Sequence, residues 1–136
     1  MTHTEEARPL VTQYAEAMWR HDAADKRHDH DATLRAMDEV HEIERKAAAP
    51  AYRPANTMPE AMHRLCIARG LLSTAFDEYL FDADQEEAMI DVEYLIDQAI
   101  FGLCRSTGFD LKSWRLDFYA GRFPMRRQVD EVEQAA

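Results

Sequence analysis

Hydrophobic residues recur at intervals of three and four through most of this chain, which is the period of an α-helix, and no stretch alternates as a β-strand would. Glycine and proline fall between the periodic stretches, where they would end helices. The pattern predicts four main helices and a short fifth. Their expected ranges are 9 to about 19, 32–48, 57–80, 82–105, and a last helix that begins at Asp110 and ends before Gly121.

Short or modest connections join these helices, which favours an all-α fold built as an up-and-down bundle with the fifth helix closing one end. A two-layer array of helical hairpins is the alternative. The chain has the length of a single domain, so residues 1–124 are expected to form one helical domain and residues 125–136 a charged tail. Residues 20–33 are polar on all sides, and periodicity does not decide whether they are helix or connection.

Several helix ends carry capping residues. Thr57 and Glu60 have the spacing of a capping box, in which each side chain accepts a hydrogen bond from a backbone N–H of the first turn. Gly108 suits a left-handed stop after the fourth helix. Phe109 and Trp114 have the spacing of a hydrophobic staple around the start of the fifth.

The fourth helix has apolar residues on two opposite sides when it is projected at about 100° per residue. The broader side is the predicted core face, made of Ala88, Met89, Val92, Leu95, Ile96, Ala99, Ile100 and Leu103. The opposite stripe is Ile90, Tyr94 and Phe101. Acids border the core face on both flanks: Glu86, Glu93 and Asp97 on one, Asp84, Glu87 and Asp91 on the other. This geometry favours a partner or self-association surface; a central bundle position and scattered surface aromatics are the alternatives.

The net charge of −10 and the isoelectric point of about 5.0 disfavour binding to nucleic acid or anionic lipid. No window resembles a membrane span, and the first residues do not resemble an export signal. We therefore expect a cytoplasmic protein. Cys66 and Cys104 fall within apolar helical stretches and are expected to be reduced.

The acidity is concentrated in one stretch. Between Arg69 and Arg105 the chain has nine acidic residues and no lysine or arginine. Basic residues follow it: Arg105, Lys112, Arg115, Arg122, Arg126 and Arg127. This segregation suits a basic protein partner or an antiparallel homodimer, while a solvated face that favours solubility is the simpler explanation.

The leading hypothesis is therefore a small acidic helical protein that binds, and thereby inhibits or masks, a basic nucleic-acid-handling or toxin-like protein surface. The expected contact residues are Asp84, Glu86, Glu87, Ile90, Asp91, Glu93, Tyr94, Asp97 and Phe101. No serine lies in a nucleophile elbow and no glycine-rich loop is present, so no catalytic residue and no cofactor are expected.

An enzymatic alternative rests on a resemblance. Glu39-Val-His-Glu42 has ExxE spacing, and Glu87 and Asp91 lie one turn apart. Together with the segments 91–96 and 108–111, these residues resemble the MazG-type all-α nucleoside triphosphate pyrophosphohydrolases. The resemblance implies a Mg²⁺ site at Glu39, Glu42, Glu87 and Asp91. The chain departs from the family pattern at Ala88, where the glutamate of the later ExxD motif would fall.

A di-iron carboxylate bundle is the second alternative, because Asp38 and His41, and likewise Glu60 and His63, have Glu-x-x-His-like spacing. Against it, Glu60 belongs to the capping box, and the helical projection turns His63 away from the core face. The simplest interpretation of Glu39 and Glu42 is that they form ion pairs within their own helix, with Arg35 and Lys46 respectively.

Overall fold

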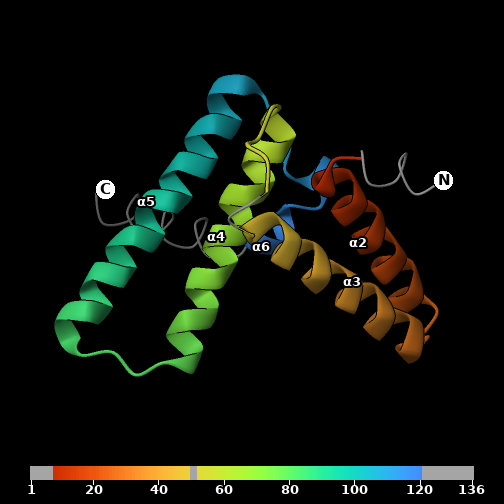
Figure 1. The fold of residues 1–136 in the computed structure, drawn as a ribbon, viewed down its shortest axis with the longest axis horizontal. Helices are drawn as coiled ribbons and strands as arrows, with labels where there is room; N and C mark the ends of the chain where they lie inside the picture. Colours follow the sequence, from red (N-terminus) through yellow and green to blue (C-terminus); the bar gives the residue numbers. More distant parts are fainter. Residues whose placement is uncertain (1–7, 50–51, 121–136) are drawn as a thin grey trace, which may run out of the picture. The chain divides into compact units, whose positions relative to one another are not determined.

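The computed structural model describes residues 8–49 and 52–120, and within these ranges all regular structure is helical. The four main helices are α2 (Leu10–Lys26), α3 (His30–Ala48), α4 (Met58–Glu78) and α5 (Ala83–Thr107) (Figure 1). A 3-10 turn, η1 (Lys112–Trp114), and the short helix α6 (Asp117–Ala120) follow them. The predicted all-α fold with four main helices and a short C-terminal helix is confirmed. None of the helices in the described ranges is both long enough and apolar enough to cross a membrane.

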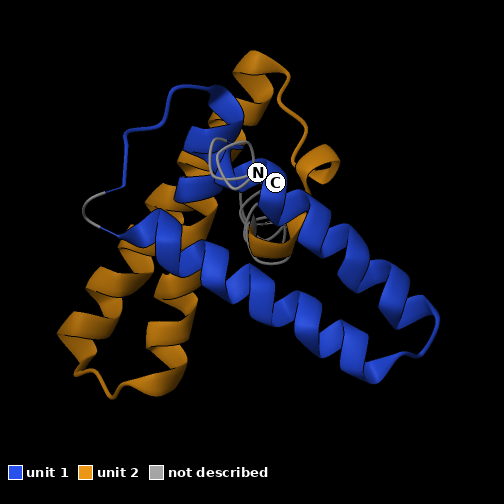
Figure 2. Cartoon of the chain, turned by 45° about the vertical axis from the view of Figure 1, so that its right-hand side comes forward, with its two compact units in different colours: residues 1–64 blue, residues 65–136 orange. Residues whose placement is uncertain are grey.

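The chain divides into two compact units, residues 1–64 and 65–136, with the boundary inside α4 (Figure 2). The first unit holds the hairpin of α2 and α3 together with the first turns of α4. The second holds the rest of α4, α5 and the C-terminal turns.

In the first unit, α2 and α3 lie side by side and run in opposite directions (Figure 1). The polar stretch that left residues 20–33 undecided continues α2 as far as Lys26. A tight turn follows, in which His28 adopts a left-handed conformation with φ 59°. Asp29 then caps α3, because its carboxylate accepts a hydrogen bond from the Ala32 N–H at 3.2 Å. The core of the hairpin includes the fully buried Tyr14 and Val40.

The start of α4 confirms half of the predicted capping box. The Thr57 hydroxyl accepts a hydrogen bond from the Glu60 N–H at 3.3 Å. The Glu60 carboxylate reaches one residue further back than the motif requires and accepts from the Asn56 N–H at 3.1 Å. It also forms a two-pronged ion pair with Arg53. Burial alone would raise the pKa of Glu60, but these donors hold it below its usual value.

In the second unit, Asp82 and Gln85 form a complete capping box at the start of α5, and Gly108 ends the helix with φ 74° as predicted. The predicted fifth helix is divided into η1 and α6 by Arg115, which has a positive φ of 57°. Tyr119 of α6 packs against α4 at Gly70, where a Cβ would lie only 3.0 Å from the tyrosine ring. Glycine is needed there for close approach. The predicted charged tail lies outside the described residues.

Candidate protein-interaction surface

A buried cation joins α4 to α5. Arg69 of α4 is 1% exposed, and its Nε donates to the Asp97 carboxylate of α5 at 2.6 Å. A second guanidinium nitrogen donates to the Glu93 carboxylate at 3.1 Å, and a third donates to the Ser73 hydroxyl. Glu93 and Asp97 are one turn apart on α5, so one guanidinium binds both. Two of the nine acids therefore have their cation on the neighbouring helix.

This ion cluster fixes the rotation of α5, and the predicted core face of α5 is wrong for half of its residues, although Ile100 is buried as predicted. Asp97 and Ile100 are the residues that α5 buries. Of the predicted core residues, Ala88, Val92, Leu95 and Ala99 are exposed, and Met89, Ile96 and Leu103 are half-buried. The projection assumed that the wider apolar side turns inward. Because buried Arg69 requires carboxylate partners, the flank with Glu93 and Asp97 faces α4 instead.

The rotation separates the expected contact residues into two groups. Asp84, Glu86, Glu87, Ile90 and Asp91 are exposed, as an interaction surface requires. Glu93, Tyr94 and Phe101 are half-buried, and Asp97 is buried. Asp97 is therefore not available to a partner, since its carboxylate is enclosed by the ion pair with Arg69.

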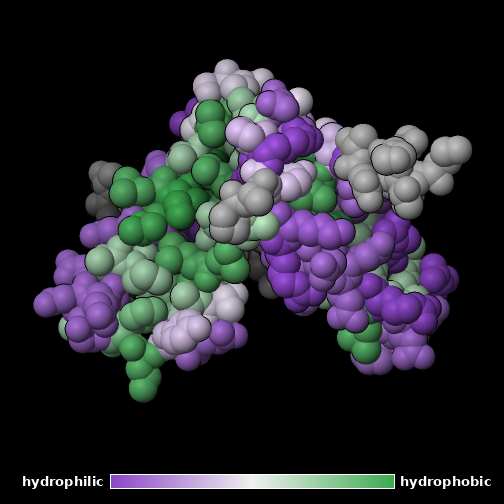
Figure 3. Space-filling model, in the orientation of Figure 1, coloured by the Kyte–Doolittle hydropathy of each residue, from purple (hydrophilic) through white to green (hydrophobic). Residues whose placement is uncertain are grey.

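The exposed acids gather where α4 ends and α5 begins, a region we call the acidic tip: Asp77, Glu78, Asp82, Asp84, Glu86, Glu87 and Asp91. None of these seven carboxylates forms an ion pair with any residue in the described ranges. Apolar side chains stand among them, with Tyr79 64% exposed and Leu80 fully exposed. Figure 3 shows hydrophilic surface at this end of the hairpin beside hydrophobic surface that spreads over α4 and α5. The tip thus combines unneutralised charge with exposed apolar area.

Comparison of the chain with protein-family models, with curated proteins and with solved structures gives no match.

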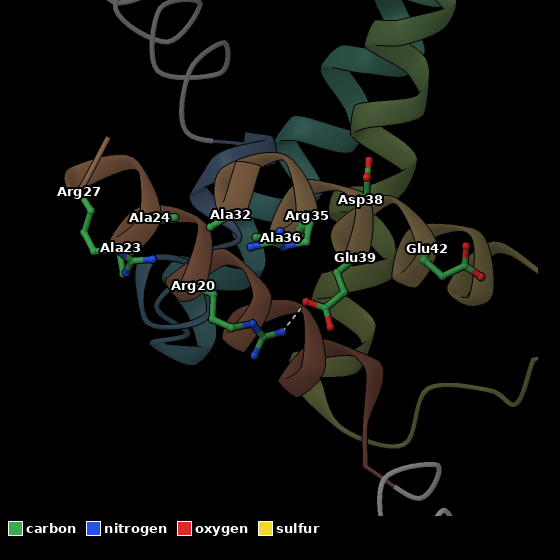
Figure 4. A pocket seen from close by; sticks show the side chains of 10 residues that line it. All are labelled: Arg20, Ala23, Ala24, Arg27, Ala32, Arg35, Ala36, Asp38, Glu39 and Glu42. Carbon is green, nitrogen blue, oxygen red and sulfur yellow. Dashed lines mark hydrogen bonds and ion pairs between the residues drawn. The ribbon is translucent and has the colours of Figure 1, made fainter. Parts of the chain in front are cut away.

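Some residues of the two metal alternatives are engaged in ion pairs. Glu39 pairs with Arg20 of α2 at 2.6 Å, and Glu42 pairs with Arg45 at 2.6 Å, so the partners predicted within the helix, Arg35 and Lys46, are wrong. Figure 4 shows Glu39 reaching toward Arg20 in a groove of about 850 Å³ between α2 and α3, while Glu42 points elsewhere. The described residues contain no group of three or more histidine, cysteine, aspartate or glutamate side chains that could hold a metal ion.

His63 also differs from expectation, because it is 2% exposed and not turned outward. Its ring lies 4.8 Å from the ring of Tyr14, within the first unit. Burial, with a smaller contribution from the Arg64 cation, lowers the pKa of His63 to about 4, so the imidazole is neutral at pH 7. Its Nε2 atom has no hydrogen-bond partner within the described ranges. His63 is a buried packing residue of α4.

Both cysteines are free thiols, as expected. Cys66 is buried, and burial raises the pKa of its thiol to about 12. Cys104 is half-buried, and burial raises its pKa as well. Neither thiol therefore has the lowered pKa of a reactive nucleophile.

Arg69 is the functional-site residue that sequence reasoning missed. A signal for it was present, because on the helical projection Arg69 shares a face with Met62 and Cys66 and not with the polar side of α4. A lone arginine within an apolar face, together with two carboxylates one turn apart on the next helix, indicates a buried ion pair.

Proposed function

We propose that this protein works by protein–protein interaction and that the acidic tip binds a basic protein surface, which it thereby inhibits or masks. The observation that supports the proposal is the set of seven exposed carboxylates without a cation among the described residues. In water each carboxylate is solvated at little cost. The electrostatic field of these carboxylates would attract a basic partner over a distance of several ångströms and would orient it.

Charge alone gives attraction with little specificity, and the apolar residues at the tip supply the second requirement. Tyr79 and Leu80 are exposed between the acids of α4 and those of α5. Aromatic and aliphatic side chains that become fully desolvated carry most of the binding energy at protein interfaces, while charges at the rim set orientation. The partner surface should therefore present arginine or lysine around an apolar pocket. Surfaces of this kind are found on nucleic-acid-handling proteins, where a bound acidic protein would compete with phosphate.

The test is a charge reversal that avoids the buried ion cluster. Glu86→Lys combined with Glu87→Lys changes two exposed acids of the tip. Reversal at Glu93 is unsuitable, because it would place a second cation against buried Arg69. The matched control is Asp25→Lys combined with Asp38→Lys, which makes the same change in net charge at exposed positions of the first unit.

Proteins captured from the native host by the wild-type chain would be identified by mass spectrometry, purified, and titrated by calorimetry at low and high salt. We expect tight, salt-sensitive binding by the wild type and the control variant, and at least about tenfold weaker binding by the tip variant. We also expect the wild type to displace nucleic acid from the purified partner. Equal affinity of the tip variant and the wild type would refute the proposal.

A further inference from the structure

The exposed apolar side of α5 has a regular spacing that the acidic tip does not explain. Ala88, Val92, Leu95, Ala99 and Gly102 follow one another at intervals of four, three, four and three residues. This is the heptad spacing with which one helix packs along another. All five residues are exposed, with Val92 at 46% and Leu95 at 66%. We call them the α5 stripe.

A row of polar residues runs beside this stripe at intervals of seven. It consists of Asp84, Asp91, Gln98 and Arg105, all exposed. Flanking positions of this kind form the ion pairs that set orientation and partner choice between packed helices. Arg105 forms no ion pair with any residue in the described ranges, and neither do the two aspartates. The row is acidic at its start, neutral in its third position and basic at its end.

We propose that the α5 stripe is covered by α5 of a second copy of this chain, which runs in the opposite direction. The flanking row is complementary to itself in that arrangement. When two such helices pair antiparallel, the same flank of each meets the other in reverse order, so that Asp84 faces the partner's Arg105 and Asp91 faces the partner's Gln98. A parallel pair would instead place this row beside the opposite flank of the partner helix, where Met89 and Ile96 offer Asp84 and Asp91 no cation.

The apolar residues agree with the same register. In this register Val92 of each chain packs against Leu95 of the other at the centre of the contact between the two stripes, which we call the seam. Ala88 packs against the partner's Ala99 toward each end of the seam. Large side chains thus fill the middle, and small ones allow the helix backbones to approach at the ends. Two independent patterns on one helix, of size and of charge, select one occupant and one direction.

The neighbouring helix offers a second row on the same hairpin. Leu65, Ala68, Leu72, Ala75 and Tyr79 lie on or just after α4 with nearly the same three-and-four spacing, and each is exposed or half-buried. Figure 3 shows hydrophobic surface across both helices. The proposed pairing uses the α5 stripe alone, because on the helical projection the stripe lies opposite Asp97, on the side of α5 away from α4.

The first experiment measures the molar mass of the full chain by light scattering and sedimentation equilibrium. The wild type should have twice the 15.7 kDa of the chain. Leu95→Glu introduces a charge into the seam and should raise the dimer dissociation constant by at least about 100-fold. The matched control is Ile90→Glu, which makes the same change at a 38% exposed position outside the stripe and should leave the dimer intact.

The second experiment tests the direction. Asp84→Arg alone places two arginines together at each end of the seam and should weaken the dimer roughly tenfold. Adding Arg105→Asp should restore it. Within one chain these residues lie 21 positions apart, about 32 Å along the helix, so rescue requires contact between chains. Each substitution also opposes the helix dipole, so intrachain effects alone would make the double variant worse than the single one.

A monomeric wild type would overturn the proposal, as would equal dissociation by Leu95→Glu and Ile90→Glu. A double variant weaker than Asp84→Arg alone would overturn the antiparallel register. The two proposals share Asp84 and Asp91, but they can be tested separately, because Glu86 and Glu87 belong to neither the stripe nor the flanking row. Their reversal should weaken partner binding and leave the dimer unchanged.

Discussion

Replacing Arg69 with methionine removes the cation that lies between two carboxylates of α5. Methionine keeps the length and flexibility of the stem but has no charge and no hydrogen-bond donor. Asp97, whose side chain is 3% exposed, then loses its partner inside the protein. Glu93, whose side chain is 13% exposed, loses the same partner but lies closer to water. The substitution thus takes the Arg69 cation from one carboxylate in a desolvated position and from a second at its edge.

Removing one partner of a buried ion pair destabilises a protein by about 3–5 kcal/mol, because the remaining charge is neither paired nor hydrated. Asp97 alone accounts for a loss of this size. Glu93 should add little, since a small rotation returns it to solvent. For a chain of this length 1 kcal/mol corresponds to about 4 °C, so the melting temperature should fall by roughly 10–20 °C.

The measurement is thermal and urea denaturation followed by circular dichroism, at one fixed protein concentration so that any association contributes equally. Arg35→Met is the matched control, because Arg35 is exposed and has no ion-pair partner in the described ranges. It should change stability by no more than about 0.5 kcal/mol. A double variant, Arg69→Met with Asp97→Leu, should recover most of the loss, because an apolar pair replaces the isolated charge. If Arg69→Met melts within about 2 °C of the wild type, the ion cluster does not hold α4 to α5.

Three further outcomes follow from local structure. The pKa of His63 lies near 4 in the folded protein and near 6.5 when unfolded, so between these values the unfolded chain binds more protons. Stability should therefore fall as pH falls from 6.5 to 4, by on the order of 3 kcal/mol, and urea titrations of His63→Phe should lack this share of the loss. Gly108→Ala should cost about 1 kcal/mol at every pH, because Gly108 has φ 74° although a Cβ added there would meet no atom within 4 Å; a neutral result would contradict the left-handed stop. Cys66 should react with a thiol reagent only as fast as the protein unfolds, and Cys104 faster; equal rates in the native protein would contradict the difference in their burial.

Local signals in the sequence were sufficient to predict the four main helices and several of their ends. The predicted stop at Gly108 and the capping role of Thr57 depend on atoms within a few residues of each other, so they do not require knowledge of the tertiary fold. Residues 20–26 were undecided because a helix that is polar on all sides has no periodicity to detect. The division of the last helix at Arg115 was not predictable from pattern, since a positive φ at arginine has no sequence signature.

The rotation of α5 could not be derived from α5 alone. A projection ranks faces by hydrophobicity, and it placed Val92 and Leu95 in the core because they lie on the widest apolar side. What decides the rotation is a residue 28 positions before Asp97, namely Arg69. Burying a cation without a carboxylate is more costly than leaving several apolar side chains in water, so the helix faces α4 with its acids. The ion pairing between α4 and α5 therefore outweighs the hydrophobicity of the faces of α5 in setting the rotation of this helix.

The buried ion cluster and the exposed stripe are consequences of the same rotation. If α5 turned its widest apolar side toward α4, Val92 and Leu95 would be covered within the chain and Arg69 would lose the carboxylates of Glu93 and Asp97. With the observed rotation, Arg69 is neutralised by Glu93 and Asp97, and the α5 stripe faces solvent. A protein that only had to be soluble would gain nothing from this exchange, because an exposed apolar row on a long helix promotes association. Burying the acids in place of the α5 stripe is favourable when association covers the stripe. The order of charges, acidic at Asp84 and basic at Arg105, makes a second copy of α5 in the opposite direction its complement.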